Sequence, residues 1–492
     1  MFHPASFSAL LRHRRTLLLQ GPMGPFFARL AAYLRDNGQD VFKVNFNGGD
    51  RLFYRSLGAV TYQGRHDDWA QWLRRFVIDN HIQAIVLFGQ TRPVHQPVAD
   101  IASQLGVELF VFEEGYDRPN HVTLEIGGVN AYSPMPRERA VYDAIPASVL
   151  PSHRRPVPTG QSFWRAARCA LAYGLAKALC AWRHPFEVYH RSLHPVCEIA
   201  KWLHGGLRKL RNLLPDRAVM RELVSSGRSG RWFLLPLQVH NDSQILRHSH
   251  YAGMEAVIDE VMASFAEHAD ADDWLVIKHH PMDRAYRNYA PYIREQSRRL
   301  GISERVRYIH DLHMPTLLTH TRGMVTVNST TGLQALHHGK PVVALGECFY
   351  AVNGLTYPGA LTSFWRDPGS VDMQLFYRFR HHLIEQNQLN GSFYARVPAF
   401  AQPPQGLPQW QTQAQAQMQV QTQAQPQMST AWKLPAAPQP PAKPGPAQPA
   451  FAHWHTPAPR WQHRALLPVH RQPLARPAVS MRAERRAKEL VH

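Results

Sequence analysis

Short apolar runs alternate with longer stretches of helical periodicity, and this order restricts the possible folds more than any other feature of the chain. The run at 16–21 ends in glycine, the pattern at 26–37 is helical, and the run at 41–46 is apolar again. Strand, helix and strand at this spacing predict a parallel sheet covered on both faces by helices. Further helices are expected at 67–80 and 98–105, and further strands at 84–88 and 108–112.

A second unit of the same kind begins near Gly230. Its expected strands are 232–236, 274–278, 306–309, 323–327 and 341–345, and its expected helices are 252–266, 286–300, 314–319 and 332–338. Ligands of such units usually bind at the carboxyl ends of the strands. We therefore expect an α/β protein with two Rossmann-like lobes, 1–150 and 226–402, that face a ligand-binding cleft.

The segment between the two lobes, 151–225, is dense in Trp, Arg, Leu and Ala and has helical periodicity. It is either a connector packed between the lobes or a basic amphipathic region on an anionic membrane surface. After Pro403 the composition changes to Gln, Ala and Pro. Such a segment buries too little apolar surface to fold, so 403–492 is predicted to be a disordered basic tail.

The formal net charge is +19; from residue 401 onward ten Lys/Arg and two Asp/Glu contribute +8, which leaves +11 for the body. A basic body predicts an anionic partner such as nucleic acid, phospholipid or a nucleotide sugar, although a bias toward Arg for solubility also explains it. No sequence pattern of a nucleic-acid-binding module is found. The four cysteines form no CxxC pair, which favours free thiols in a reducing cytoplasm. Neither a spanning apolar run nor a signal peptide is recognised.

Polar residues follow the expected strands of the first unit. Gly21 and Gly24 follow the first strand, where glycine lets the backbone approach a ligand, although a structural turn explains them equally well. Glu113 and Glu114 end the strand that begins at 108, and neighbouring side chains of an extended chain point to opposite sides.

One of these two carboxylates is therefore expected to face the ligand, as a nucleophile or base toward an anomeric carbon. The other is expected to pair with a structural partner such as Arg118, and a purely salt-bridged loop is the alternative. Asn130 adds a further polar group downstream.

The second unit contributes three groups of polar residues at strand ends. They are Gln238, Asp242 and Ser243; Lys278, His279, His280 and Pro281; and Asn328, Ser329, Thr330, Thr331 and Gly332. The lysine and histidines form a cationic site for phosphate, in which a histidine can donate a proton to a leaving group. The hydroxyl-rich turn either caps the next helix or holds an anionic part of a nucleotide. Adjacent histidines point apart, so we expect no metal.

Taken together, the motifs resemble the bacterial capsule polysaccharide β-Kdo transferases. The motifs that carry the resemblance are Glu113-Glu114-Gly115-Tyr116 with Arg118-Pro119, Pro236-Leu237-Gln238 with Asp242-Ser243-Gln244-Ile245, Lys278-His279-His280-Pro281, Asn328-Ser329-Thr330-Thr331-Gly332, Gly339-Lys340-Pro341-Val342, and Gly354-Leu355-Thr356 with Gly359, Leu361, Phe364 and Trp365. The resemblance covers about 16–365. It implies a GT-B-like fold in which the second lobe binds CMP-Kdo, with no other cofactor. The first lobe is then expected to lie on the acceptor or sugar side, with Gly21, Gly24, Arg118 and Asn130 as its candidate residues.

The resemblance also implies transfer of Kdo to a phosphatidylglycerol-type lipid with retention of configuration, through a carboxylate nucleophile. The second acid of the motif, Glu114, would be that nucleophile. Related modules often have Asp there, so Glu113 stays a candidate. A single copy of the motif set is typical of the member that adds the first Kdo. Such a protein would lie on the inner membrane from the cytoplasm, with other capsule assembly proteins as possible partners. The alternatives are a transferase that uses another nucleotide sugar and a non-catalytic protein that binds capsule polysaccharide for export.

Overall fold

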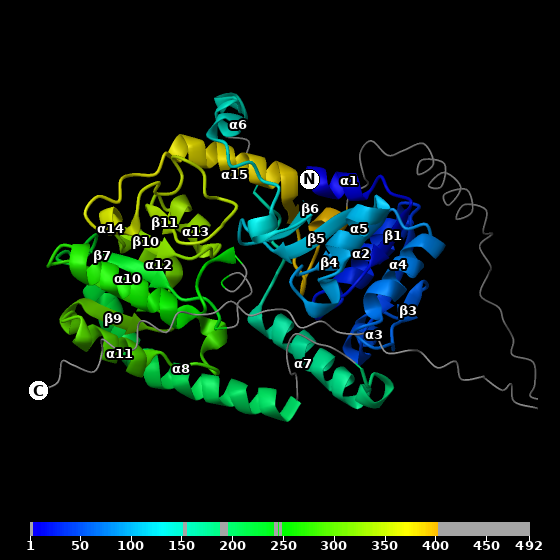
Figure 1. The fold of residues 1–492 in the computed structure, drawn as a ribbon, viewed down its shortest axis with the longest axis horizontal. Helices are drawn as coiled ribbons and strands as arrows, with labels where there is room; N and C mark the ends of the chain where they lie inside the picture. Colours follow the sequence, from blue (N-terminus) through cyan, green and yellow to red (C-terminus); the bar gives the residue numbers. More distant parts are fainter. Residues whose placement is uncertain (1–2, 151–154, 187–194, 241–244, 246–247, 402–492) are drawn as a thin grey trace, which may run out of the picture. The chain divides into compact units, whose positions relative to one another are not determined.

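The computed structural model describes residues 3–150, 155–186, 195–240, 245 and 248–401. Its first sheet has seven strands in the order β12-β6-β5-β4-β1-β2-β3. Figure 1 shows most of this sheet in the blue and cyan part of the chain, surrounded by helices. Five of them are parallel: β1 Arg15–Leu18, β2 Asp40–Asn45, β3 Ala59–Thr61, β4 Ala84–Phe88 and β5 Glu108–Glu114. The other two are antiparallel: β6 His121–Ile126 pairs with β5, and β12 Gln388–Asn390 pairs with β6.

Helices cover both faces of this sheet because alternate strand residues are apolar on each side. The helices are α1 Ala5–Leu10, α2 Phe26–Asp36, α3 Gly48–Phe53, α4 Trp69–Asp79 and α5 Val98–Leu105. One core joins α1 and α2 to Phe110 and Phe112 of β5. The opposite core joins α4 and α5 to Leu109 and Val111. The strand β5 is therefore buried from both sides.

The second sheet has five parallel strands in the order β11-β10-β7-β8-β9. They are β7 Trp232–Pro236, β8 Trp274–Lys278, β9 Val306–Ile309, β10 Gly323–Thr326 and β11 Val342–Ala344. The surrounding helices are α10 Met254–His268, α11 Ala290–Arg299, α12 Met314–His320, α13 Thr331–His337, α14 Leu361–Phe364 and α15 Met373–Asn387. The two sheets confirm the expectation of two Rossmann-like α/β lobes.

The last described helix and strand of the chain return to the first sheet. The predicted lobe boundaries do not include this return. Helix α15 contacts α1, the short helix α6 (Arg139–Asp143) and β6, and the following strand β12 completes the edge of the first sheet. The predicted C-terminal range 226–402 is therefore wrong for 388–390. A strand of three residues is too short to show a periodic pattern, so the sequence does not predict it. It forms because it pairs with the otherwise open edge strand β6.

The segment between the lobes forms two long helices, α7 Phe163–Leu179 and α8 Pro195–Leu223. Helix α7 packs on α3 of the first lobe, where the hydroxyl of Tyr173 donates a 2.9 Å hydrogen bond to Asp50. None of the described helices is both long and apolar enough to cross a membrane. Within the described side chains, Cys169, Cys180 and Cys348 are free thiols. The predicted tail at 403–492 and the predicted site residues Asp242 and Ser243 lie outside the described residues.

Candidate active site at the strand ends

The two acids that end β5 lie on opposite faces of the first sheet. Glu113 pairs with Thr123 of β6, and Glu114 pairs with Val122. By alternation, Glu114 shares its face with Phe112, whose ring contacts Phe26 of α2 at a centroid distance of 5.1 Å. Glu113 lies on the other face, and its Oε1 accepts a 3.0 Å hydrogen bond from the backbone N–H of Glu114. The expected divergence of the two side chains is confirmed by this register.

Glu114 is in a poorly hydrated environment. Burial raises the pKa of its carboxyl, and the positive charge of Arg118 opposes the rise. Arg118 itself donates a 2.8 Å hydrogen bond from Nε to the carbonyl of Gly115. Gly115 allows this tight turn, because a Cβ there would lie 2.2 Å from the carbonyl oxygen of His121. Arg118 thus stabilises the turn and supplies positive charge to Glu114.

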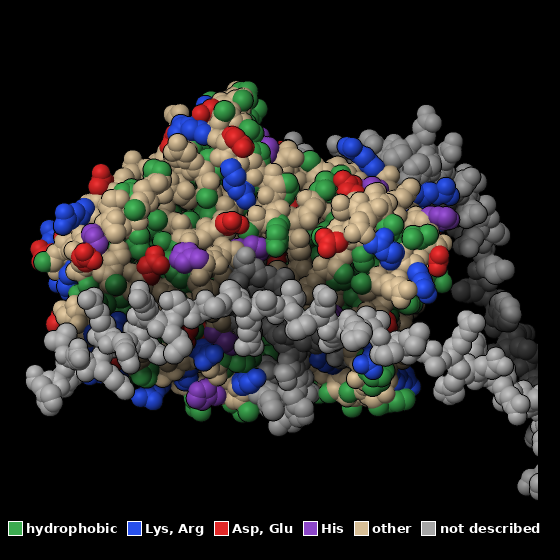
Figure 2. Space-filling view, viewed as in Figure 1, with side chains coloured by type: hydrophobic (Ala, Val, Ile, Leu, Met, Phe, Trp, Pro, Cys, Tyr) green, Lys and Arg blue, Asp and Glu red, His purple; other side chains and the backbone are tan. Residues whose placement is uncertain are grey.

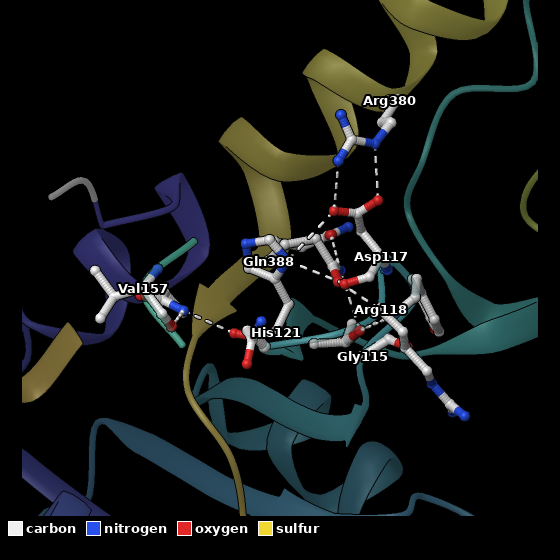
Figure 3. Close-up of polar contacts among 12 residues, drawn as sticks. Gly115, Asp117, Arg118, His121, Val157, Arg380 and Gln388 are labelled. Atoms are coloured by element: carbon white, nitrogen blue, oxygen red, sulfur yellow. Dashed lines mark hydrogen bonds and ion pairs between the residues drawn. The ribbon is translucent and has the colours of Figure 1, made fainter. Parts of the chain in front are cut away.

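The turn after Glu114 is attached to α15 by Asp117. Its carboxylate accepts two hydrogen bonds from Arg380, at 2.8 and 2.9 Å (Figure 3). Nδ1 of His121 lies 3.3 Å from Oδ2 of the same carboxylate. Burial alone would raise the pKa of Asp117, but the hydrogen bonds from His121 and Arg380 prevail and lower it to about 2. Gln388 of β12 also accepts the backbone N–H groups of Tyr116 and Asp117. The acidic motif is therefore held by residues more than 260 positions away.

A buried carboxylate, Glu125, lies behind the motif and was not among the predicted site residues. It accepts hydrogen bonds from Ser133 at 2.6 Å, Asn387 at 2.7 Å and the hydroxyl of Tyr116 at 3.1 Å. Burial raises its pKa to about 7, although the hydrogen bonds from Ser133 and Tyr116 and the charge of Arg137 oppose the rise. Its position opposite Val111 places it on the same sheet face as Glu113. Only the strand β6, which was not predicted, could have indicated this.

Two further contacts join the first lobe to Phe349 of the second lobe. The ring of Tyr116 stacks on Phe349 with a centroid distance of 4.1 Å and an interplanar angle of 20°. Arg137 donates a 2.8 Å hydrogen bond to the carbonyl of the same Phe349. The loop that follows β11 thus contacts the residues that follow Glu114.

Both sheets reverse their strand order at a point bridged by side chains. In the first sheet the reversal lies between β1 and β4, where Arg92 donates to Gln20 Oε1 at 3.1 Å and to the carbonyl of Gly21 at 2.9 Å. In the second sheet it lies between β7 and β10, where the amide of Gln238 donates to Asn328 at 3.1 Å. Ligands of open α/β sheets bind at such reversals. Arg92 was not among the predicted site residues, although it follows the predicted strand at 84–88 by four residues.

The structure explains why Gly21, Gly24 and Asn130 occupy their positions near the first reversal. A Cβ at Gly21 would lie 2.7 Å from the ring of Phe27, and the N–H of Gly24 donates to the carbonyl of Pro22 at 2.8 Å. Asn130 has a left-handed φ of 61°, and its N–H donates a 2.6 Å hydrogen bond to the hydroxyl of Tyr116. A role of these residues on the acceptor side stays a prediction.

The hydroxyl-rich turn begins α13 without a side-chain cap from its N-cap residue Thr330. Instead, Ser329 accepts the backbone N–H of Thr331 at 3.2 Å and donates to the Thr331 hydroxyl at 3.1 Å. Gly332 is required by packing, since a Cβ there would lie 2.3 Å from the hydroxyl of Tyr350. The turn lies next to Asn328 and hence to the second reversal.

Lys278 and His279 are buried inside the second lobe. The ammonium of Lys278 donates to the carbonyl of His310 at 3.0 Å, and burial lowers its pKa. Nδ1 of His279 lies 2.7 Å from the hydroxyl of Tyr308, and burial, followed by the charge of His310, lowers its pKa to about 3. Lys278 thus joins the ends of β8 and β9, and His279 is neutral. Both residues have structural partners within the lobe, and their predicted donor-binding role stays a prediction.

His280 is oriented by the turn that follows it. Its Nδ1 accepts the backbone N–H of Met282 at 3.2 Å, so the proton of the neutral ring lies on Nε2. Pro281 opens the short helical turn that contains Met282 and Asp283. In this tautomer Nε2 is a hydrogen-bond donor, as the predicted contact with a phosphate requires.

A histidine–aspartate pair lies beside His280 and was not predicted as a site. Nδ1 of His240, four residues after β7, forms an ion pair with the completely buried carboxylate of Asp283. Among the described residues there is no group of three or more His, Cys, Asp or Glu that could hold a metal ion.

A basic cavity of about 710 Å³ lies at the carboxyl ends of β2 and β3. Asn45 and Thr61 line it at the strand ends, and Arg51, Arg55 and Arg183 supply three guanidinium groups. Arg51 lies in α3, Arg55 two residues after it and Arg183 after α7, so no local motif reveals them.

Comparison with known proteins identifies the relatives of this sequence. The family model described as capsule polysaccharide biosynthesis protein matches residues 83–394. The capsule polysaccharide export protein KpsS of Escherichia coli is 39% identical over 79% of this chain and 99% of its own. The capsule polysaccharide modification protein LipB of Neisseria meningitidis serogroup A is 38% identical over 77% of this chain and 92% of its own. A solved structure of the β-Kdo 2,7 transferase of Thermosulfurimonas dismutans KpsC is 14% identical, with a TM-score of 0.36 over 74% of this chain and 89% of its own. The sequence relatives carry the family assignment.

Proposed function

This chain belongs to the capsule polysaccharide biosynthesis protein family, and from that premise we propose that it is a retaining glycosyltransferase that moves Kdo from CMP-Kdo to a lipid acceptor. The acceptor would be a phosphatidylglycerol or lysophosphatidylglycerol, and the product would begin the lipid-linked linker of a capsule polysaccharide. The observation that carries the proposal is the placement of Glu114 and Glu113 on opposite faces of β5, with Glu114 desolvated at the strand end.

The proposed reaction has two displacements at the anomeric carbon. A carboxylate oxygen of Glu114 forms a bond to that carbon while the bond to the phosphate oxygen breaks, and CMP leaves with the bonding electron pair. The hydroxyl of the acceptor then attacks the same carbon, the ester to Glu114 breaks, and the hydroxyl proton passes to a base. Two inversions give net retention. Desolvation makes the ionised carboxylate of Glu114 more reactive, and Arg118 favours its ionised form.

The donor is proposed to bind at the second reversal, near Gln238, Asn328 and the turn at 329–332. His280 would donate Nε2–H to the phosphate as negative charge develops on it. The His240–Asp283 pair lies on the neighbouring strand end and would keep a second imidazole near the same phosphate. The ligand side of this proposal rests on the position of the strand reversal and on the tautomer of His280.

Two other functions compete with this proposal. A transferase of the same construction could use CMP-sialic acid or a UDP-sugar, because the fold of the second lobe does not specify the sugar. A non-catalytic protein could bind capsule polysaccharide for export, as the printed name of the relative KpsS suggests for that protein. A binding protein would have no use for a desolvated carboxylate at the proposed position of the anomeric carbon.

One assay separates these functions. The protein is incubated with CMP-Kdo and a fluorescent lysophosphatidylglycerol, and the lipid product is analysed by mass spectrometry. The proposal predicts the mass gain of one Kdo residue and the release of CMP. Product formation from CMP-sialic acid or a UDP-sugar instead would establish another transferase. Tight binding of capsule polysaccharide without turnover of any donor would establish the export function.

A further inference from the structure

Helix α8 is attached to the rest of the protein through polar side chains. Arg208 donates hydrogen bonds to the backbone carbonyls of Arg284 and Arg287. The buried carboxylate of Asp216 accepts the backbone N–H groups of His310 and Asp311, the latter at 2.9 Å. Between Arg208 and Asp216 the inner face of the helix is therefore polar, whereas Val219, Met220 and Leu223 near its C-terminal end pack into the core of the second lobe.

The opposite face of α8 is apolar and exposed to solvent. Leu203, Leu207, Leu210 and Leu214 have exposed fractions of 67%, 66%, 68% and 72%. Their spacing of four, three and four residues places them in one stripe along the helix. A surface helix normally buries such a stripe against its own core, so α8 has the reverse of the usual arrangement.

Helix α7 shows the same exposure of large apolar side chains. Leu171, Leu175 and Leu179 recur every four residues and are 40%, 45% and 76% exposed. Trp164 and Trp182, near the two ends of the helix, are 73% and 74% exposed. Helices α7 and α8 contact each other, and Figure 2 shows hydrophobic and basic side chains gathered along the edge that contains them.

The side chains around these stripes are basic. Lys209, Arg211, Arg217 and Arg221 are exposed on α8, and Arg165 and Arg168 are exposed on α7. Helix α7 contains no acidic residue. The cavity with Arg51, Arg55 and Arg183 lies at the end of α7, next to Trp182. An apolar stripe with tryptophans and a basic border matches the interface of an anionic bilayer, where leucine and indole enter the acyl boundary and cations meet the headgroups.

We propose that the exposed faces of α7 and α8 are a docking surface for an anionic phospholipid bilayer, in which the leucines of both helices insert at the interface. The proposed docking depends on the exposed helix faces and does not require that the protein transfers a sugar. It adds to the proposed function the place at which the protein meets a membrane-embedded acceptor.

The test measures binding of the full chain to vesicles by co-sedimentation. Vesicles of phosphatidylcholine with phosphatidylglycerol are compared with vesicles of phosphatidylcholine alone, at low and at high salt. We expect binding only to the anionic vesicles, weakened by salt. The variant Leu207→Glu/Leu210→Glu is expected to lower the apparent affinity at least 10-fold, and Arg211→Glu about 5-fold.

The matched controls carry the same substitutions at exposed positions elsewhere. Leu57 is 87% exposed and Arg298 is an exposed partner of Glu295, so Leu57→Glu and Arg298→Glu are expected to bind vesicles as the unchanged protein does. Equal binding by the α8 variants and the controls would overturn the proposal. A dimer that dissociates in the leucine variant would assign the surface to a second copy of the chain instead. Vesicle binding is measured without CMP-Kdo, so no sugar is transferred in this assay and its failure is separate from failure of the transfer assay.

Discussion

Arg380 of α15 holds the carboxylate of Asp117 in a two-point contact, with N–O distances of 2.8 and 2.9 Å. Both side chains are largely buried, with exposed fractions of 18% and 14%. The pair fixes the turn that follows Glu114, so it connects α15 to the candidate nucleophile.

Replacement of Arg380 by Lys should destabilise the protein, because lysine retains the charge but cannot form the planar two-point contact. We expect a loss of about 2 kcal/mol in the free energy of unfolding, measured by urea denaturation at neutral pH. The control Arg298→Lys alters an exposed ion pair and should change the free energy by less than about 0.5 kcal/mol. Equal unfolding free energies of Arg380→Lys and Arg298→Lys would show that the Arg380–Asp117 pair does not stabilise the fold.

The same pair predicts a loss of stability in acid. The pKa of Asp117 is lowered to about 2 in the folded protein, so this group stabilises the fold above its ordinary pKa of 3.8. That contribution, about 2 kcal/mol, disappears as the pH falls from about 4 through 2. The difference in unfolding free energy between the unchanged protein and Asp117→Asn should therefore narrow over this range. A constant difference would contradict the assignment.

Glu125 predicts a pH dependence of the opposite sign. Its pKa is about 7 in the folded protein and lies near 4.5 when the chain unfolds, so between these values the folded state binds the proton more tightly. Its contribution to stability is complete below pH 4.5 and is lost, by about 3 kcal/mol, as the pH rises through 7. In Glu125→Gln this loss should be absent.

The pH profile of the unfolding free energy must be compared between the unchanged protein and Glu125→Gln, because other groups also titrate in this range. His279 has a pKa of about 3 in the folded protein, so its contribution to stability increases as the pH rises from 3 to its ordinary value of 6.5. The two effects oppose each other in part of the range. Identical pH profiles of the unfolding free energy for the unchanged protein and Glu125→Gln would refute the role of Glu125.

Glu114→Gln should abolish transfer and leave the fold intact. An amide cannot act as the nucleophile, so we expect a fall in kcat of at least about 10³-fold with an unchanged thermal midpoint. Glu113→Gln is the matched control, because it changes the neighbouring acid on the other face of β5. Retained activity in Glu114→Gln together with a loss in Glu113→Gln would transfer the nucleophilic role to Glu113.

His280→Ala should weaken the binding of CMP by about 10- to 150-fold, the effect of losing one hydrogen bond to a charged phosphate. Isothermal titration calorimetry with CMP measures this directly. His313→Ala removes an exposed imidazole of the same lobe and should bind CMP normally. Equal affinities of the two variants would remove His280 from the donor site.

His240 and Asp283 should be energetically coupled. His240→Ala leaves a fully buried carboxylate without its partner and should cost about 3 kcal/mol of stability. The double variant His240→Ala/Asp283→Ala should be destabilised by about 1–3 kcal/mol less than the sum of the two single variants. Urea denaturation of all four proteins tests this, and additive effects would show that the pair is not coupled.

The sequence by itself determined the two α/β units and the position of the motifs. Apolar periodicity is a local property, and it placed strands such as β4 and β8 and helices such as α2 and α10 at their observed positions. The alternation of side chains along β5 also follows from the backbone alone, so the divergence of Glu113 and Glu114 was predictable. The identity of the face that each acid occupies was not, because it depends on which helix packs there.

Only the tertiary structure decided the contacts between distant segments. Arg380 and Asp117 are 263 residues apart, and β12 pairs with β6 without any periodic pattern of its own. Such contacts depend on the surface that the rest of the fold leaves open, which no local window contains. The orientation of α8 is a further case: Arg208 and the buried Asp216 bond to backbone groups of the second lobe, and the leucines at 203, 207, 210 and 214 face solvent. A helix orients by its strongest available partners, and those partners exist only after the second lobe has formed.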